Sequence, residues 1–105
     1  MDTIRQRIIA CLEDRPMNSM DISQEIGIME KEVFEHLSHI AQSSQAQGKR
    51  LVIHPSKCLK CGYIFEGRKR FTRPGKCPKC KATRVQRPEY QIVGRLEHED
   101  FQSDF

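Results

Sequence analysis

Apolar side chains recur every three or four residues over the first part of the chain, which is the spacing of amphipathic helices. In the first such segment, residues 3–14, the apolar face consists of Ile4, Ile8, Cys11 and Leu12. Thr3 and Gln6 form a capping box that begins this helix, and Pro16 lies just beyond its end. Because Cys11 lies on the apolar face, we expect it to be a small core residue.

Two further helices are predicted after the first. A short one begins at Asn18 or Ser19, either of which can cap it, and ends at Gly27. A longer one runs from about Glu30 to Gln47, and its inward stripe is Val33, Phe34, Leu37, Ile40, Ala41 and Ser44. Two helices joined by a three-residue turn that contains glycine have the geometry of a helix-turn-helix, although other small helical bundles share that pattern.

The hydrophobic period changes to two in two later runs, "RLVIHP" (50–55) and "EYQIVG" (89–94). If these runs pair antiparallel, they form a two-stranded wing with the intervening segment at its tip. Within that segment, "YIFEG" (63–67) and "KRFT" (69–72) predict two short strands that are joined by a turn at Gly67.

Four cysteines in the intervening segment follow the spacing C-x2-C-x15-C-x2-C, and they are Cys58, Cys61, Cys77 and Cys80. This spacing is typical of four-thiolate zinc sites, in which each pair forms a tight turn around one ion. Gly62 gives the first turn its backbone freedom, whereas Lys81 occupies the corresponding place in the second. The sequence therefore predicts one structural Zn²⁺ per chain. Iron is the alternative metal, because it also binds four thiolates.

Charge is strongly segregated along the chain. Residues 49–87 contain thirteen Lys and Arg side chains and a single acid, Glu66, whereas the segments before and after them are net acidic. Such asymmetry favours nucleic acid or another polyanion as the partner. The candidate phosphate contacts lie on the loop between the cysteine pairs and are Arg68, Lys69, Arg70, Arg73 and Lys76.

The order of predicted elements resembles a family of predicted transcriptional regulators, in which a rubredoxin-like zinc ribbon is set into the wing of a winged helix-turn-helix. The stretches that carry the resemblance are "SMDISQEIGIMEKEVFEHLSHI", "KRLVIHPSKCLKCGYIF", "CPKC" and "YQIV", and the most specific part is "RLVIHPSKCLKCGY". The resemblance implies a small α+β fold, metal ligation by the four cysteines, DNA binding and transcriptional control.

The predicted organisation divides the chain into four parts. Residues 1–54 hold the helices and the first wing strand, residues 55–87 the zinc ribbon, residues 88–96 the second wing strand, and residues 97–105 an acidic tail.

The third helix leaves two interpretations open. In a helix-turn-helix this helix enters the major groove, and Glu35, His39 and Gln42 are then the candidate base contacts. Carboxylates such as Glu32 and Glu35 would also face phosphates, which is unfavourable. The alternative is that the acidic face of this helix binds a protein partner.

The remaining features narrow the function classes. The chain has no apolar run of the roughly 20 residues that a membrane helix needs, no signal peptide and no nucleophile–base arrangement. We therefore expect a cytoplasmic protein that is not an enzyme and has no membrane partner. A DNA-binding transcriptional regulator is the leading hypothesis, and a homodimer would suit paired half-sites. The alternatives are an adaptor that docks on the transcription machinery and a rubredoxin-like iron electron carrier.

Overall fold

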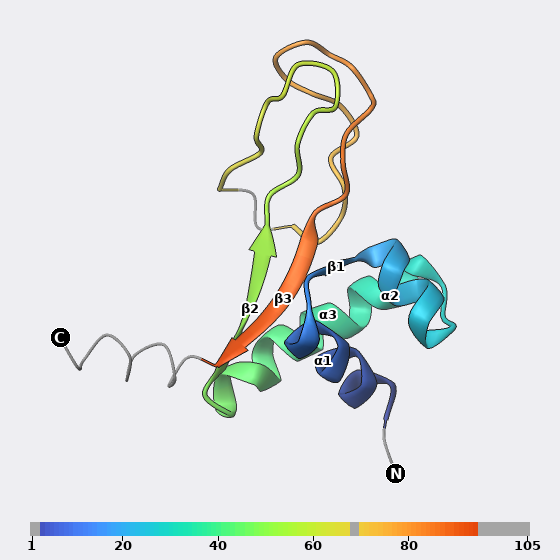
Figure 1. Cartoon of the computed structure of the whole chain (residues 1–105), viewed down its shortest axis with the longest axis vertical. Helices are drawn as coiled ribbons and strands as arrows, with labels where there is room; N and C mark the ends of the chain where they lie inside the picture. Colours follow the sequence, from blue (N-terminus) through green and yellow to red (C-terminus); the bar gives the residue numbers. More distant parts are fainter. Residues whose placement is uncertain (1–2, 68–69, 95–105) are drawn as a thin grey trace, which may run out of the picture.

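The computed structural model describes residues 3–67 and 70–94, and within them it contains three helices and three strands (Figure 1). In chain order these elements are α1 (Ile4–Asp14), β1 (Met17–Asn18), α2 (Ser19–Ile26), α3 (Glu30–Ala46), β2 (Lys49–His54) and β3 (Glu89–Gly94). The fold is therefore a small α+β fold. The predicted acidic tail and the end of the second wing strand, residues 95–105, lie outside the described residues, as do Arg68 and Lys69.

Local hydrogen bonds begin the first two helices where the sequence predicts. The Thr3 hydroxyl accepts the Gln6 backbone N–H at 3.1 Å, and the Gln6 side chain accepts the Thr3 N–H at 3.0 Å. Asn18 caps α2 in the same way, accepting the Asp21 N–H at 2.7 Å. Gly27 ends α2 with a φ of 84°, a left-handed conformation that costs glycine little.

The three strands form one antiparallel sheet in the order β1-β3-β2. β2 and β3 pair along their whole length with Leu51 opposite Ile92, so the predicted pairing of these two runs is confirmed. The short strand β1 was not predicted. It consists of two residues, which are too few to give a periodic signal, and it forms where Met17 is buried opposite Tyr90.

The hydrophobic core lies between the sheet and the three helices. Its fully buried side chains include Ile8, Leu12, Ile22, Val33, Leu37, Ile40 and Tyr90. Cys11, predicted to be a core residue, is partly buried and packs against this cluster. Ile4 is an exception on the apolar face of α1, because it is 39% exposed and lines a surface hollow with Arg5 and His36.

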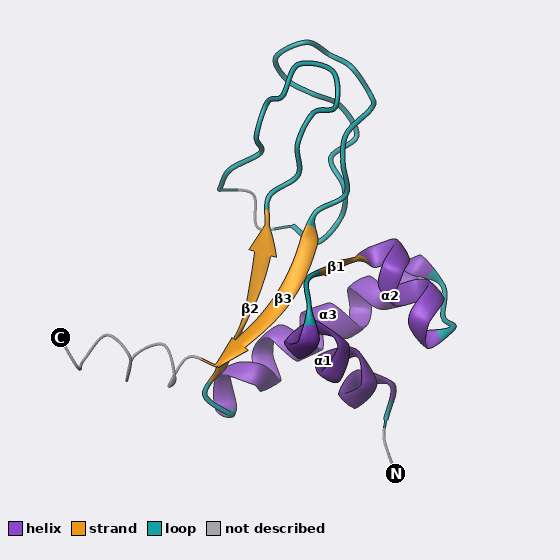
Figure 2. Cartoon of the chain, in the orientation of Figure 1, coloured by secondary structure: helices purple, strands orange, loops and turns teal. Residues whose placement is uncertain are grey.

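Residues 55–87, here called the cysteine segment, join β2 to β3 and project beyond the end of the sheet (Figure 2). The two short strands predicted at 63–67 and 69–72 are wrong for the described residues. Instead, residues 63–65 turn back onto residues 56–58, with the Cys58 N–H donating to the Tyr63 carbonyl at 2.8 Å and the Phe65 N–H to the Ser56 carbonyl at 3.0 Å. The tight turn at the first cysteine pair dictates this pairing.

The base of the cysteine segment is attached to the core by an aromatic contact. Phe71 packs against the core cluster and edge-on against Tyr90, with ring centroids 6.0 Å apart. The Tyr90 hydroxyl also donates a hydrogen bond to the Phe71 carbonyl. Phe71 lies between the two cysteine pairs, so the loop that joins them is fixed to the sheet as well as to the cysteines.

A second contact attaches the last residue of the cysteine segment to the helices. Arg87 Nε donates to the Glu30 carboxylate at 2.9 Å, and the buried Ser19 hydroxyl donates to the same oxygen at 2.5 Å. Glu30 is the first residue of α3, and Ser19 is the first residue of α2. One carboxylate therefore connects the cysteine segment with the amino ends of both helices.

Replacing Phe71 tests whether its contact depends on the metal-bound segment. We expect Phe71→Ala to lower the free energy of unfolding of the metal-loaded protein by about 1–3 kcal/mol, because a half-buried ring is lost. After chelation the same substitution should have little effect, because the loop that holds Phe71 is then no longer ordered. Urea unfolding of both variants in both states measures the difference, and Phe71→Leu is the matched control. An equal loss in the two states would show that the contact is independent of the metal.

Candidate metal centre

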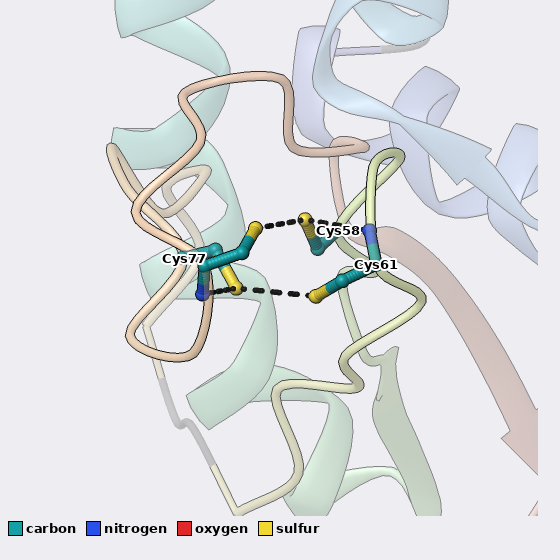
Figure 3. Close-up of side chains that lie close together, drawn as sticks. Cys58, Cys61 and Cys77 are labelled. Carbon is teal, nitrogen blue, oxygen red and sulfur yellow. Dashed lines mark hydrogen bonds between the residues drawn. The ribbon is translucent and has the colours of Figure 1, made fainter.

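The Sγ atoms of Cys58, Cys61, Cys77 and Cys80 all lie within 4.8 Å of one another. The Cys58 and Cys80 sulfurs are 3.6 Å apart, and those of Cys61 and Cys77 are 3.7 Å apart. In Figure 3 one loop carries Cys58 and Cys61, and these two residues face Cys77 on another loop. A tetrahedral ion with metal–sulfur bonds of about 2.3 Å requires sulfur–sulfur distances of about 3.8 Å. The four thiols therefore fit one tetrahedral ion, and we describe them as a four-cysteine metal site.

The first pair of cysteines is shaped by a turn that we call the first knuckle, residues 58–63. The Gly62 N–H donates to the Cys58 carbonyl at 2.9 Å, and the Cys61 N–H points at the Cys58 sulfur at 3.5 Å. Gly62 has a φ of 82°, so the turn needs a residue that tolerates the left-handed region. The backbone thus positions both thiols of this pair on the same side of the loop.

The second knuckle, residues 77–82, repeats this geometry. The Lys81 N–H donates to the Cys77 carbonyl at 2.8 Å, and the Cys80 N–H points at the Cys77 sulfur at 3.5 Å. Lys81 has a φ of 65°, and it is the non-glycine residue with positive φ among those described. The two knuckles differ at this position, which is lysine in the second and glycine in the first.

The electrostatics of the four thiols favour a bound cation. The backbone N–H of Cys61 lowers the pKa of Cys58 to about 6, against the opposing effect of burial. At Cys61 the Tyr63 N–H lowers the pKa, but burial and the neighbouring Cys80, Cys58 and Cys77 side chains outweigh it and raise the pKa to about 11. Thiolates this close together repel one another, so all four ionise together only when a cation neutralises them.

The chemistry of the donor set indicates a structural role. Four thiolates around one ion leave no open coordination position for water or a substrate. Cys58 and Cys77 are fully buried, which protects the bonds on that side of the site. Within residues 3–67 and 70–94, His36 and His39 do not join a cluster of three or more metal-binding side chains.

The predicted DNA contacts lie on two separate parts of the fold. Arg70, Arg73 and Lys76 are exposed on the cysteine segment between the knuckles. On α3, the exposed candidates are Glu35, His39 and Gln42. The remaining two candidates, Arg68 and Lys69, belong to the part of the chain that is not described.

Two of the three acids on α3 are engaged within the fold, which the sequence alone did not show. The Glu32 carboxylate accepts the Met29 N–H at 2.8 Å and so caps its own helix. At Glu30, the hydrogen bond from Ser19 and then that from Arg87 lower the pKa of the carboxyl. Glu35 is therefore the exposed carboxylate on α3, a helix that is described in full.

No helix in residues 3–67 and 70–94 combines the length and the apolar character that crossing a membrane requires.

Cysteine substitutions test the metal site. Purified protein should hold about one metal ion per chain, as measured by elemental analysis. Cys58→Ser should lower the metal content, because it removes a buried ligand, while Cys11→Ser should leave the content unchanged because Cys11 packs in the core. Full metal retention after the loss of any two of the four cysteines would contradict the assignment.

The backbone of the second knuckle gives an independent prediction. Lys81→Gly should stabilise the metal-loaded protein by about 1 kcal/mol, because glycine relieves the left-handed strain at this position. The matched substitution in the first knuckle, Gly62→Ala, should destabilise it by a similar amount. Thermal unfolding of the three proteins measures both effects. A loss of stability in Lys81→Gly would show that the lysine side chain contributes more than its backbone costs.

Comparison with known proteins matches a little less than half of the sequence to a family model and the fold to a solved structure. Residues 3–52 match the family model described as PF0610-like, N-terminal, which spans α1 to most of β2. The chain is also similar to the solution NMR structure of the protein PF0610 from Pyrococcus furiosus, with a TM-score of 0.71 and 26% sequence identity. That similarity covers 86% of this chain and 88% of the other. A search of curated proteins gave no match. The chain is thus similar to PF0610 over most of its length.

Proposed function

We propose that this protein is a DNA-binding transcriptional regulator, built as a winged helix-turn-helix with a structural zinc ribbon inserted in its wing. The order α1-β1-α2-α3-β2-β3 and the sheet order β1-β3-β2 support this interpretation. In it, α2 and α3 are the helix-turn-helix, β2 and β3 are the wing, and the cysteine segment is the ribbon.

The observation that carries the proposal is the surface of α3. Because Glu30 and Glu32 are engaged within the fold, the exposed charges on α3 are Lys31 and Glu35, and the part of its exposed face that follows them, up to Ser43, is polar and uncharged. That part of the face consists of Ser38, His39, Gln42 and Ser43. Side chains of this kind form hydrogen bonds with base edges without the repulsion that an acidic helix would meet at the phosphates.

The cysteine segment supplies the positive charge that α3 lacks. Its described part exposes Arg70, Arg73 and Lys76, and the whole region 49–87 holds a single acid. A bound ion would hold this loop in one shape, so that the guanidinium and ammonium groups meet phosphates with little further loss of entropy. We propose that the cysteine segment contacts the sugar–phosphate backbone of the DNA and that α3 contacts the base edges.

Zinc is the metal that this function needs. A closed four-thiolate site with Zn²⁺ stabilises the fold and has no redox chemistry, and the same closed site supports a protein that is not an enzyme. The iron-containing electron carrier is the competing function. An absorption spectrum separates the two, because ferric four-thiolate sites are coloured and zinc sites are colourless.

The salt dependence of DNA binding tests the phosphate contacts. Each phosphate that is neutralised contributes about 0.9 to the slope of log affinity against log salt. Replacing Arg70, Arg73 and Lys76 with Ala should therefore weaken binding to every sequence and reduce this slope by up to about 2.7. The matched control removes the same charge from α1 and its end with Arg5, Arg7 and Arg15 replaced by Ala. Equal slopes for the two triple variants would contradict the proposed role of the cysteine segment.

Substitutions on α3 test base recognition separately. His39→Ala and Gln42→Ala should relax the sequence preference in a DNA-selection experiment, while the salt slope stays nearly unchanged. Gln24→Ala, an exposed residue of α2 outside the face proposed to contact bases, is the control for a general effect of substitution. If Glu35→Ala strengthens binding to all sequences equally, Glu35 faces phosphates. Unchanged sequence preference in both His39→Ala and Gln42→Ala would show that α3 does not read bases.

A further inference from the structure

The first knuckle and the residue that follows it expose three large apolar side chains that neither the metal nor the core requires. Leu59 is 60% exposed, Ile64 40% and Tyr63 37%. Residues 63–65 are paired in extended conformation and Tyr63 packs on Phe65, so Tyr63 lies on the face opposite to Ile64. We call Leu59 and Ile64 the knuckle patch. None of the three side chains belongs to the core cluster or to the side chains that pack against it among the described residues. Single exposed apolar residues are common, but three within six positions on one loop are not scattered.

The second knuckle shows that the metal geometry does not need these side chains. Its backbone hydrogen bonds repeat those of the first knuckle, with Cys77, Lys81 and Ala82 in the places of Cys58, Gly62 and Tyr63. The positions that correspond to Leu59, Tyr63 and Ile64 are Pro78, Ala82 and Thr83. The same turn therefore forms with small side chains, and the apolar side chains of the first knuckle need another explanation.

The first knuckle is ordered by contacts of its own. Lys57 pairs with Ile64 in an isolated antiparallel bridge, and the Leu59 N–H donates to the Arg84 carbonyl at 2.9 Å. Tyr63 packs edge-on against Phe65 with ring centroids 5.0 Å apart, which limits the orientations of its ring. A partner that binds here would lose little entropy in ordering the surface.

Basic residues border the patch and decide the charge of its partner. Lys57, Lys60 and Arg84 are exposed on the segments that hold the patch. A second copy of the same surface would bring these like charges together, which disfavours self-association. The sugar–phosphate backbone of duplex DNA offers little for aliphatic side chains to contact, whereas a bulky apolar side chain of a protein packs against them.

We propose that the knuckle patch is a docking site for an acidic protein segment that carries a bulky apolar side chain. In this complex the apolar side chain packs on Leu59 and Ile64, and carboxylates of the partner pair with Lys57, Lys60 and Arg84. The apolar contact supplies most of the affinity, because exposed ion pairs contribute little, and the charges select the partner. The site does not depend on DNA binding, and it gives the protein a second surface besides the one proposed for DNA.

A peptide selection tests this proposal with the full, metal-loaded chain as bait and a library of short random peptides as probe. Enriched peptides should combine several Asp or Glu residues with Leu, Ile, Phe or Trp. Their affinity should fall by about tenfold or more, about 1.4 kcal/mol, in a Leu59→Ser, Ile64→Ser variant. The matched control in the second knuckle, Pro78→Ser with Thr83→Ser, should bind them like the native protein, and metal content should be unchanged in both variants.

Three results would overturn the proposal. They are the enrichment of peptides without acids, equal affinity of the enriched peptides for the two double variants, and no enrichment at all. Single-stranded nucleic acid is the rival ligand, because bases stack on exposed aromatic rings in basic surroundings. If no peptide is enriched, and oligothymidylate binds the native chain and loses affinity in Tyr63→Ala, this loop binds nucleic acid instead of a protein.

Discussion

The convergence of four sulfur atoms within 4.8 Å is the constraint on which the rest of this structure depends. The cysteine segment has almost no core of its own, since the buried apolar side chains among its described residues are Pro74, Val85 and the ligands Cys58 and Cys77. Neighbouring thiolates repel one another, so a bound cation is needed to hold them together. We therefore expect the metal to stabilise this basic segment, as the hydrophobic core stabilises the helices.

The metal-binding part and the helical part are joined at two places, and this arrangement sets the orientation of the whole molecule. Phe71 packs on the core beside Tyr90, and Arg87 binds Glu30 at the start of α3. Glu30 also accepts from Ser19 at the start of α2. These packed side chains and hydrogen bonds connect the cysteine segment with the core and with the amino ends of α2 and α3.

Local signals in the sequence predict much of this fold, and distant contacts explain what they miss. The helix ends at Thr3, Asn18 and Gly27 follow from hydrogen bonds and φ angles within a few residues, and the cysteine spacing follows from the tight turns around a metal. The sequence pattern does not predict β1, because this strand forms by pairing with Tyr90, which is far along the chain. The strands expected at 63–67 and 69–72 fail because residues 63–65 pair with 56–58 instead. Glu30 binds Arg87, which lies 57 residues away in the sequence, so no local pattern predicts this contact.

The central claim is that α3 and the cysteine segment face DNA together. Chemical-shift mapping by NMR tests it most directly, with the metal-loaded full chain titrated with a duplex of about 20 base pairs, or two helical turns, at low salt. The account predicts that the amides of Ser38 to Ser43 and of Arg70 to Lys76 shift together as the duplex is added, while those of α1 stay in place. Shifts that are confined to α1, or the absence of any shift, would contradict it.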